Sequence, residues 1–329
     1  MYSNPTIDVH DLRKSFVVPI RGEGLRAALR NTLRRQHRSV TAVAGVTFQV
    51  QPGEFVAFLG SNGAGKTTTL KMLTGLLRAS GGSVQVLGQD PSKRHRSLLS
   101  QLALVMGQRS QLIWDLPAGD SFEVHRAIYR VGQADFRRRV AQFVDLLDIG
   151  DVVRKPVRNL SLGERMKCEL AVALLHQPSV VFLDEPTIGL DTTMQRRMRE
   201  FLRDYNREHG ATIVLTSHYM ADVEALCKRV IVIDAGTLVF DGSLEQLMGE
   251  FSSHKRLVVA FAHDVPSMHD LCDVVSVDCN RAVLRVCNTQ AAQVTAQLLA
   301  LHDVTDLVVE DPSIEDVIER VYIGAGATH

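Results

Sequence analysis

The sequence has 329 residues, 45% of them hydrophobic, and its 37 lysines and arginines are balanced by 37 aspartates and glutamates. This length predicts one large domain with a small one, or two medium domains, with enough apolar residues for a sizeable core. The zero net charge argues against a nucleic-acid partner held by bulk charge. No apolar run approaches the roughly 18 residues of a membrane-spanning helix, and residues 1–5 show no sign of a signal peptide.

The cysteines lie far apart and form no C-x-x-C pair, which is typical of reduced thiols in the cytosol. There are five of them: Cys168, Cys227, Cys272, Cys279 and Cys287. The last three and His269 allow a metal site to be imagined, but their spacing fits no familiar zinc pattern. Buried core thiols are the preferred interpretation.

The N-terminal part reads as a strand that is interrupted by a basic insert. Residues 6–16 alternate weakly and predict a first strand, whereas residues 17–40 hold several arginines and one acid, Glu23. From Leu25 onward the pattern is helical, with leucines on one stripe and arginines on the next, including Arg26, Arg30 and Arg34. A basic amphipathic helix lies at an anionic membrane surface or docks on a partner. A solvated helix folded onto its own domain is equally compatible with the pattern.

A glycine-rich segment follows the alternating residues 40–50 and the short apolar run 54–59. It matches G-x-x-x-x-G-K-[ST] at every fixed position, and apolar residues at helical spacing follow it. Its glycines let backbone N–H groups turn around a phosphate, and the helix N-terminus adds positive potential. The lysine is expected to reach β- and γ-phosphates and the first threonine to bind Mg²⁺. The segment comprises Gly60, Ser61, Asn62, Gly63, Ala64, Gly65, Lys66, Thr67 and Thr68.

The central part alternates between short strands and helices. Residues 81–88 predict a turn and a strand, and residues 102–106 an apolar strand that ends at Gly107 and Gln108. Residues 115–177 predict helices that open at Ser121, Asp135 and Ser161. Ser161 and Glu164 form an S-x-x-E capping box, which is sufficient for a helix start. It leaves Gly163 unexplained, because glycine in a helix costs about 1 kcal/mol relative to alanine; a close ligand would explain it.

Two further strands end in polar residues. The run 180–183 is typical of a buried parallel strand, and Asp184 and Glu185 follow at its carboxyl end, where ligands bind in such sheets. One acid there is placed to hold Mg²⁺ and the other to deprotonate a water. The strand predicted at 211–217 ends at His218, which we interpret as functional because three strands now deliver polar groups to one edge. Residues 230–241 predict a hairpin around Ala235 and Gly236.

Residues of roughly 6–245 together resemble the nucleotide-binding subunit of an ATP-binding cassette (ABC) transporter. The family's elements occur in order: the Walker A loop (Gly60–Thr68), the Q-loop Gln108, an LSGGQ-like signature (160–164), the Walker B Asp184 with Glu185, the D-loop ending at Asp191, and the switch His218. Leu162 and Glu164 depart from the signature, whereas Ser161 and Gly163 remain. Phe16 corresponds to the family's adenine-stacking aromatic residue.

The resemblance implies an α/β P-loop fold in residues 1–245: a RecA-like core, an antiparallel β subdomain and a helical subdomain at about 109–178. It implies an ATPase in which Mg²⁺ is held by Thr67, Gln108 and Asp184, Glu185 is the base, and His218 senses the γ-phosphate beside Lys66. Each nucleotide would lie between the Walker A loop of one chain and Ser161, Gly163 and Asp191 at the facing signature and D-loop. The chain carries one copy of each half, so a homodimer is the simplest assembly.

The expected partners are polytopic permease subunits, with the ATPase in the cytoplasm, peripheral on the inner face of the cell membrane. Residues 107–117, which include the single tryptophan Trp114, resemble an exporter subgroup that includes drug, antibiotic and viologen exporters. Trp114 itself would suit a core or an interface. An importer ATPase and a non-transport ABC ATPase are the alternatives. The transported molecule is not encoded here, because its pathway would belong to another polypeptide.

Residues 250–329 predict a separate unit. Strands are expected at 256–261, 274–277, 282–286 and 304–310, with helices at 264–271, 289–301 and 313–322. This order is βαββαβ plus a helix, a ferredoxin-like pattern. It holds no catalytic constellation, so dimer contact or regulation are its expected roles, between which fold alone does not decide.

Overall fold

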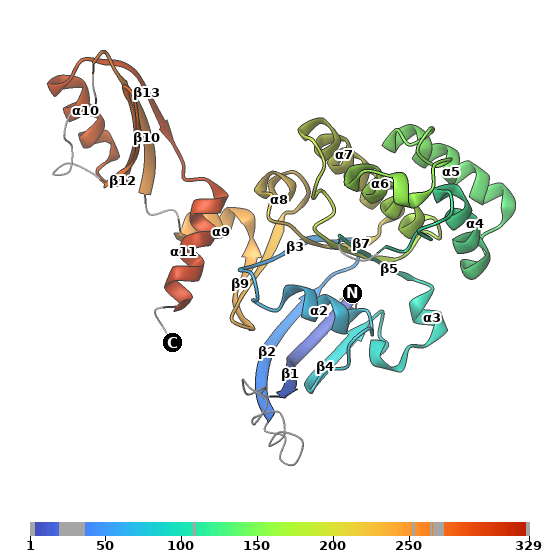
Figure 1. Cartoon of the computed structure of the whole chain (residues 1–329). Coiled ribbons are helices and arrows are strands. Elements are labelled where there is room, and N and C mark those ends of the chain that lie inside the picture. Colours follow the sequence, from blue (N-terminus) through green and yellow to red (C-terminus); the bar gives the residue numbers. More distant parts are fainter. Residues whose placement is uncertain are drawn as a thin grey trace, which may run out of the picture. The chain divides into compact units, whose positions relative to one another are not determined.

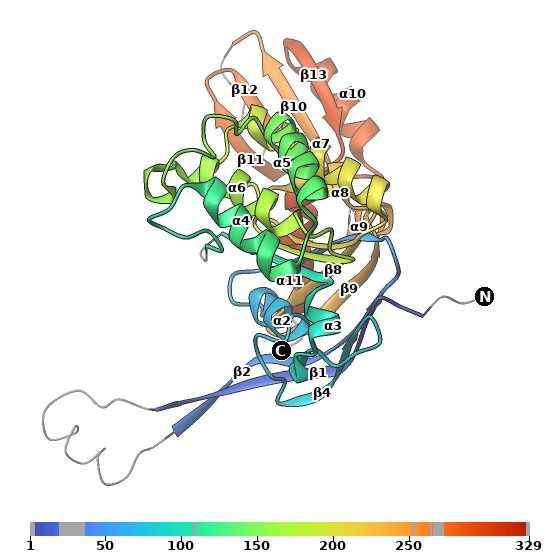
Figure 2. The same ribbon diagram turned by 90° about the vertical axis from the view of Figure 1, so that its right-hand side faces the viewer.

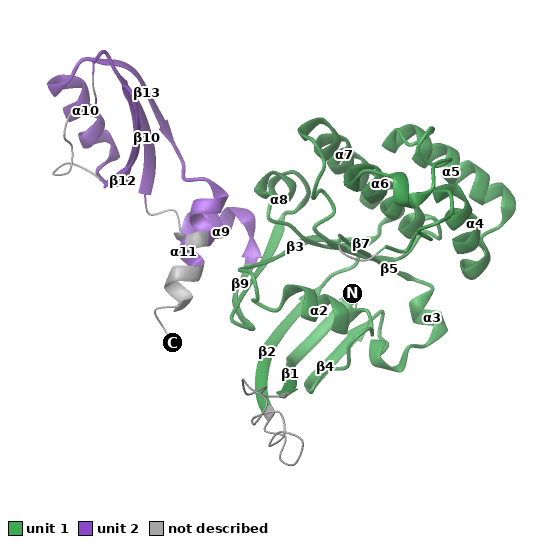
Figure 3. Cartoon of the chain, in the orientation of Figure 1, with its two compact units in different colours: residues 1–241 green, residues 242–329 purple. Residues whose placement is uncertain are grey.

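The computed structural model describes residues 4–19, 37–107, 110–251, 254–263, 265 and 273–326. The chain divides into unit 1, Met1–Asp241, and unit 2, Gly242–His329 (Figure 3). Several predictions fall outside the described residues: the helix containing Arg26, Arg30 and Arg34, the placement of Gln108, the metal-site candidates Cys272 and His269, and nearly all of the helix expected at 264–271.

Unit 1 is built on a mainly parallel sheet of six strands. In spatial order these are β5 (Leu102–Met106), β6 (Val180–Asp184), β7 (Thr212–Thr216), β3 (Phe55–Gly60), β8 (Arg229–Asp234) and β9 (Thr237–Ser243). All four strand pairs from β5 to β8 are parallel. Their apolar runs are buried almost without interruption, because a parallel sheet is covered on both faces.

Helices cover both faces of this sheet. Figures 1 and 2 show α2 (Lys66–Leu73) on one side of it and α5 (Gln133–Leu147), α6 (Leu162–Leu174) and α7 (Thr192–His209) on the other. The remaining helices of unit 1 are the one-turn α3 (Arg96–Leu99), α4 (Ala118–Tyr129) and α8 (Met220–Leu226), with 3₁₀ turns at Pro91–Lys93 and Val157–Asn159.

A second, antiparallel sheet packs beneath α2. Its order is β2 (His37–Val50), β1 (Ile7–Pro19) and β4 (Gly81–Val86). One buried cluster joins it through Leu70 and Leu73 of α2 to Phe58 of β3 and Phe182 of β6. The predicted core, helical part and antiparallel sheet are therefore all present, as the fold prediction requires.

Some predicted boundaries were wrong. The strands do not stop at 16 and resume at 40, because the β1–β2 ladder continues to the pair Pro19 and His37; β-branched Val17 and Val18 favour the extended backbone. The helix assigned to Ser121 begins at Ala118, and the helix assigned to Asp135 begins at Gln133. Ser121 is not an N-cap, because its buried hydroxyl accepts the N–H of Ile113 at 2.9 Å.

Unit 2 contains a four-stranded antiparallel sheet in the order β11 (Asp273–Asp278), β12 (Arg281–Cys287), β10 (His254–Phe261) and β13 (Val304–Glu310). Numbered along the chain, this order is 2-3-1-4, the neighbour relation of the predicted ferredoxin-like pattern. Helices α9 (Leu244–Phe251), α10 (Ala291–Leu301) and α11 (Ile314–Gly326) complete the unit. Leu257 and Val259 of β10 pack with Leu298 of α10, so this helix covers one face of the sheet.

The cysteines follow the prediction only in part. All those in the described part of the chain are free thiols. Cys168 and Cys227 are buried, but Cys279 and Cys287 are exposed, so the expectation of core thiols was wrong for this pair. Cys279 lies in the tight turn between β11 and β12, and Cys287 alternates with the buried positions of β12.

Among the described residues, no helix combines the length and the apolar character needed to cross a membrane. The same residues contain no group of His, Cys, Asp or Glu side chains arranged to hold a metal ion by themselves.

Candidate active site

The glycine-rich loop joins β3 to α2, and its glycines are required for different reasons. A Cβ on Gly60 would lie 2.5 Å from the carbonyl oxygen of Ile233, and a Cβ on Gly65, at φ +103°, would lie 2.5 Å from that of Ala42. Gly63 has φ +87° but faces open space. Two of the glycines therefore let neighbouring strands approach the loop, and the third keeps its outer side open to a ligand.

Lys66 lies at the first position of α2 and is nearly buried, with 9% of its surface exposed. Its Nζ donates hydrogen bonds to the carbonyl oxygens of Gly60 at 2.6 Å and Ser61 at 3.0 Å. Burial lowers the pKa of Lys66, and the nearby Glu185 and Asp184 carboxylates oppose that effect. The ammonium group is thus held at the loop, beside the acids that end β6.

Asp184 links the loop to two neighbouring strands. One carboxylate oxygen accepts the Thr67 hydroxyl at 3.1 Å, and the other accepts the Thr216 hydroxyl at 2.6 Å. The β6–β7 register places Asp184 directly beside Thr216. The resulting group of carboxylate and hydroxyl oxygens is the chemistry that Mg²⁺ prefers.

Glu185 and His218 face each other at the ends of β6 and β7. Glu185 Oε1 lies 3.1 Å from His218 Nε2, and the Glu185 N–H donates to the carbonyl oxygen of Thr216 at 3.0 Å. Glu185 adopts φ 56°, a left-handed conformation that is costly for a residue with a side chain. Both side chains remain accessible, at 32% and 48% exposure, so a water or a phosphate can reach them.

A cavity of about 470 Å³ lies at three of these groups, whereas Lys66 and His218 are not part of its lining. It is lined by Thr67, Asp184 and Glu185, with Gly107, Leu162 and Ile188 among the other residues at its walls. A pocket of this size with a few converging polar groups at the carboxyl edge of a parallel sheet is the expected form of a ligand site. Gly107 donates its N–H to the Asp184 carbonyl oxygen at 3.3 Å, so the chain enters the Q-loop at this cavity.

The residues assigned to the signature occupy a helix N-terminus. The predicted capping box is confirmed: Ser161 Oγ accepts the Glu164 N–H at 3.2 Å and Glu164 Oε2 accepts the Ser161 N–H at 2.9 Å. The two departures from the motif have local partners. Leu162 packs on Gly189, where an added Cβ would lie 2.4 Å from its side chain, and Glu164 pairs with Lys155 at 3.2 Å. Gly163 in turn lies against Leu190 and the carbonyl oxygen of Gly189.

Phe16 and Asp191 do not line this cavity. Phe16 lies on β1 opposite Val40 of β2, and its side chain is 38% exposed. Lys14 Nζ lies 5.1 Å from the centroid of the Phe16 ring. Two residues after Val40 comes Ala42, whose carbonyl oxygen lies against Gly65 of the glycine loop. Asp191 caps α7 by accepting the Met194 N–H at 2.9 Å. Gln108 lies outside the described residues.

Asp222 on α8 is a residue that the sequence did not single out. Its fully buried carboxylate accepts the Thr187 hydroxyl at 2.5 Å, the Ser217 hydroxyl at 3.1 Å and Arg199 Nη1 at 2.8 Å. Thr187 follows Glu185 by two residues, and Ser217 precedes His218. Asp222 therefore holds the two loops that carry the facing side chains of Glu185 and His218.

The sequence also did not single out two other acidic residues that support the site, Asp234 and Glu169. Asp234, at the end of β8, accepts the Ser61 hydroxyl at 2.7 Å and so supports the glycine loop. Glu169 of α6 is buried and accepts the Gln111 N–H at 2.9 Å and the Ser110 hydroxyl, which ties the segment after Gln108 to the signature helix. Burial raises the pKa of Glu169, and these hydrogen bonds oppose that rise. Each partner is distant in sequence, and no local pattern indicates it.

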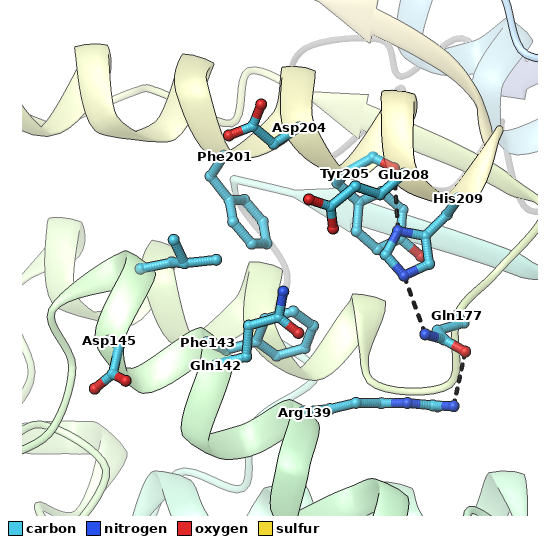
Figure 4. Close-up of a pocket in the computed structure, with 11 residues that line it drawn as sticks. Arg139, Gln142, Phe143, Asp145, Gln177, Phe201, Asp204, Tyr205, Glu208 and His209 are labelled. Atoms are coloured by element: carbon cyan, nitrogen blue, oxygen red, sulfur yellow. Dashed lines mark hydrogen bonds between the residues drawn. The ribbon is translucent and has the colours of Figure 1, made fainter.

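A second cavity, of about 290 Å³, lies between α5 and α7 (Figure 4). Its side chains bond to one another: Arg139 donates to Gln177 at 2.7 Å, and Gln177 bonds to His209 at 3.0 Å. None of the predicted site residues lines it. We assign it to packing between the helices, away from the sheet edge where the predicted site residues gather.

Comparisons with known proteins agree with this site. A family model described as "ABC transporter" matches residues 43–188, and one described as "EvrA-like ABC transporter, C-terminal domain" matches residues 253–310. The ABC transporter ATP-binding protein NatA of Bacillus subtilis is 35% identical over 208 residues, which cover 63% of this chain and 84% of NatA. Nod factor export ATP-binding protein I of Ralstonia nicotianae is 32% identical over 243 residues, covering 73% and 74%.

Among solved structures, a dimeric ATP-binding cassette in a post-hydrolysis state bound to ADP and Pi has a similar fold. It matches with a TM-score of 0.61 at 21% identity, covering 72% of this chain and 98% of that one. Strand, glycine loop, helix and the acids of β6 define a P-loop nucleoside triphosphatase. Within that class, the chain belongs to the ABC transporter family, as an ATP-hydrolysing ATP-binding subunit, and the predicted fold class and family are confirmed.

Proposed function

We propose that the protein is the motor subunit of a membrane exporter and that ATP is hydrolysed at the carboxyl edge of its parallel sheet. The observation that carries this proposal is that Thr67, Asp184 and Glu185 line one cavity, with the Lys66 ammonium near the two acids and His218 Nε2 3.1 Å from Glu185 Oε1. These groups come from three neighbouring strand ends. Their chemistry suits positioning and charge stabilisation, which supply most of the catalysis in phosphoryl transfer.

Each group then has a distinct role. The backbone of residues 60–68 cradles the phosphates, with Lys66 turning from loop carbonyls to the β- and γ-phosphates. Thr67 and Asp184 would hold Mg²⁺, with Gln108 as a further ligand, and the ion would neutralise phosphate charge when bound. Phe16, with its half-open ring on β1, would stack on the adenine.

Hydrolysis then needs one activated water. Glu185 accepts a proton from this water while the water oxygen attacks the γ-phosphorus. The bond between the γ-phosphorus and the oxygen that bridges to the β-phosphate breaks, and ADP leaves. His218 Nε2, already 3.1 Å from Glu185 Oε1, orients that carboxylate and contacts the γ-phosphate. The left-handed backbone at Glu185 holds the carboxylate toward the cavity rather than along the strand.

A second copy of the chain completes the site in this proposal. Ser161, Gly163 and Asp191 are the signature and D-loop positions expected to face the nucleotide of the other subunit. Ser161 and Asp191 cap α6 and α7 in their own chain, and both are exposed, so the positive N-terminal ends of these helices are accessible to a phosphate. The dimeric ATP-binding cassette with a similar fold supports this arrangement.

Replacing Glu185 with Gln tests the reaction and the assembly together. We expect ATP binding to persist, because Asp184 and Lys66 are unchanged, and hydrolysis to fall by about 10²–10⁴. The uncleaved nucleotide should then hold two chains together, so light scattering should show more dimer with Mg-ATP than without it. The control is the double variant that combines Glu185→Gln with Lys66→Ala, which should not form the nucleotide-dependent dimer. Parental hydrolysis by Glu185→Gln would show that another group is the base.

An exposed apolar surface after the Q-loop supports a permease partner. Ile113, Trp114 and Leu116 are exposed by 40%, 54% and 39%. Of the two positions that the sequence allowed for Trp114, core or interface, this exposure is compatible with the interface. We propose that this surface contacts the membrane subunit at the inner face of the membrane, and the similarity to a Nod factor export protein favours export over import.

The arginines of the insert remain a sequence-based proposal. If Arg26, Arg30 and Arg34 contact anionic lipid, their joint replacement by Gln should weaken binding to phosphatidylserine vesicles by on the order of 1 kcal/mol per arginine. A flotation assay at low and at physiological salt measures this effect. Equal flotation of variant and parent at low salt would exclude the membrane contact and leave a surface helix.

A further inference from the structure

Unit 2 contains a cavity whose walls carry an excess of positive charge. It measures about 270 Å³ and is lined by residues of β10, β11, β12, the turn before α11 and α11 itself. Four lysine and arginine residues line it against one acid, Asp316. They are Lys255, Arg256, Arg285 and Arg320. Such an imbalance in a concave surface raises the local concentration of anions.

Two of these arginines are direct neighbours across the sheet. Arg256 on β10 pairs with Arg285 on β12 in the antiparallel register. Like charges at directly opposite positions destabilise a sheet. Asp273 and Glu310 flank the two arginines in the same row. Neither arginine forms an ion pair with them, or with any other acid in the described part of the chain.

The other charges at the cavity have partners. Lys255 Nζ bonds to Asp311 at 2.5 Å, and Asp316 accepts the backbone N–H of Ser313 at 3.3 Å. Arg320 Nη1 lies 3.1 Å from His254 Nδ1, which fixes this guanidinium beside the strand. The Nε of Arg256 is fully buried and has no hydrogen-bond partner in the structure. A buried donor without a partner normally costs stability.

The site therefore resembles a place where a ligand supplies the missing acceptor. Guanidinium groups from a strand pair and a helix present planar forks, which match the oxygens of phosphate or carboxylate groups. Val275, Val283 and Pro312 provide an apolar wall in the same cavity. The burial of His254 and the nearby Arg320 and Arg285 lower its pKa, so this imidazole is neutral near pH 7 and can accept the hydrogen bond from Arg320.

We propose that unit 2 binds a small organic anion in this cavity, with its phosphate or carboxylate head between Arg256, Arg285 and Arg320 and its apolar body on Val275 and Val283. The site would give the C-terminal unit a ligand of its own, separate from the nucleotide at the glycine loop. Nothing in its chemistry requires a metal ion or a covalent step.

Methyl NMR of the full chain tests this site directly, because the signals of Val275 and Val283 report on the surroundings of this cavity. Phenyl phosphate and benzoate are the probes, and benzyl alcohol is the neutral control. Saturable shifts are expected for the Val275 and Val283 methyls but not for Val308, which lies on β13 outside the cavity lining. The two probes distinguish a phosphate head from a carboxylate head. Equal response to benzyl alcohol would overturn the anion site.

Variants separate binding from structure. Arg285→Gln and Arg256→Gln should each lower the affinity for the anion by about tenfold or more. Arg285→Lys should retain part of the affinity, because it keeps the charge but loses the fork. Arg281→Gln is the matched control: it lies on the same strand and face as Arg285, 4.0 Å from Asp306 and outside the cavity, and should change affinity less than about twofold.

Stability without ligand provides the second measurement. Removing one of two repelling arginines should leave the unfolding midpoint of the anion-free Arg285→Gln chain unchanged or higher. A clearly lower midpoint would mean that the arginine holds the unit together and would overturn its role in ligand binding. Equal loss of affinity in Arg281→Gln would show non-specific attraction and would likewise overturn the proposal.

Discussion

Charged side chains are treated differently in the two units. In unit 1, Asp222 is fully buried and three donors surround its carboxylate, while Asp184 receives two hydroxyl groups. In unit 2, Arg256 and Arg285 are adjacent, and no acid pairs with either among the described residues. An internally satisfied charge positions other groups. The buried Nε of Arg256, which has no internal partner, points to one that comes from outside the chain.

The sheets explain this contrast. Parallel strands in unit 1 are covered on both faces, and their carboxyl ends bring side chains from several strands to one edge, where they can bond to each other. The antiparallel sheet of unit 2 has α10 on one face only. Arg256 and Arg285 alternate with the buried residues of their strands and so lie on the other face. If the contrast is correct, replacing the charged residues described here should lower stability or activity in unit 1, whereas replacing Arg256 or Arg285 should leave the stability of unit 2 unchanged.

The largest effect is expected at Lys66. Lys66→Ala removes the ammonium group from the glycine loop and should lower ATP affinity by about 100-fold or more, with hydrolysis lost, because charge-assisted bonds to phosphate are strong. Isothermal titration with ATP and a phosphate-release assay measure both. The control is Lys93→Ala, an exposed lysine in the 3₁₀ turn. Unchanged ATP affinity in Lys66→Ala would show that the nucleotide binds elsewhere.

Asp222 tests whether satisfied charge positions the Glu185–His218 pair. Asp222→Asn leaves Arg199, which is only 17% exposed, without its ion partner and should cost about 3–5 kcal/mol of stability. Hydrolysis should fall by about 10- to 100-fold at saturating ATP, because the loops that hold Glu185 and His218 shift. Denaturant unfolding and kcat measure the two effects. The matched control, Asp204→Asn, breaks an exposed helix pair and should cost less than about 1 kcal/mol. Full kcat in Asp222→Asn would reduce Asp222 to a structural role.

His176 lies between the two cases, because one of its ring nitrogens has a hydrogen-bond partner and the other has none. Its contribution to stability should depend on pH. Its Nε2 bonds to the Leu102 carbonyl oxygen at 3.1 Å, whereas its buried Nδ1 has no partner. Burial lowers the pKa of His176 to about 4. The unfolded chain binds this proton near pH 6.5 and the folded chain only near pH 4, so stability is fully present above pH 6.5 and is lost as pH falls toward 4.

The full loss would be on the order of 3 kcal/mol for a shift of this size. His176→Gln keeps a donor for Leu102 but does not titrate, so it should flatten the fall in stability between pH 6.5 and 4. Denaturant unfolding at several pH values measures the slope, with the exposed His95→Gln as control. An unchanged slope in His176→Gln would show that another group carries the acid sensitivity.

Local sequence determined the elements to which we assign the nucleotide chemistry. Gly60–Thr68 depends on adjacent residues for its turn, and Ser161 and Glu164 lie three residues apart, as a capping box requires. Asp184 at the end of β6, Glu185 after it and His218 after β7 follow from strands that the apolar runs predict by themselves. The strand and helix order of unit 2 likewise follows from local periodicity, which is why its ferredoxin-like sheet order could be anticipated.

Tertiary structure alone decided which distant residues support these elements. Asp234 reaches Ser61 across 173 positions, and Arg199 reaches Asp222 only because α7 and α8 pack together. The Arg256–Arg285 pair depends on the register of β10 and β12, which a shift of one residue would place on the opposite face. Local patterns encode backbone conformation. Long-range hydrogen bonds and charge neighbours depend on how the sheets and helices come together, so only the folded structure reveals them.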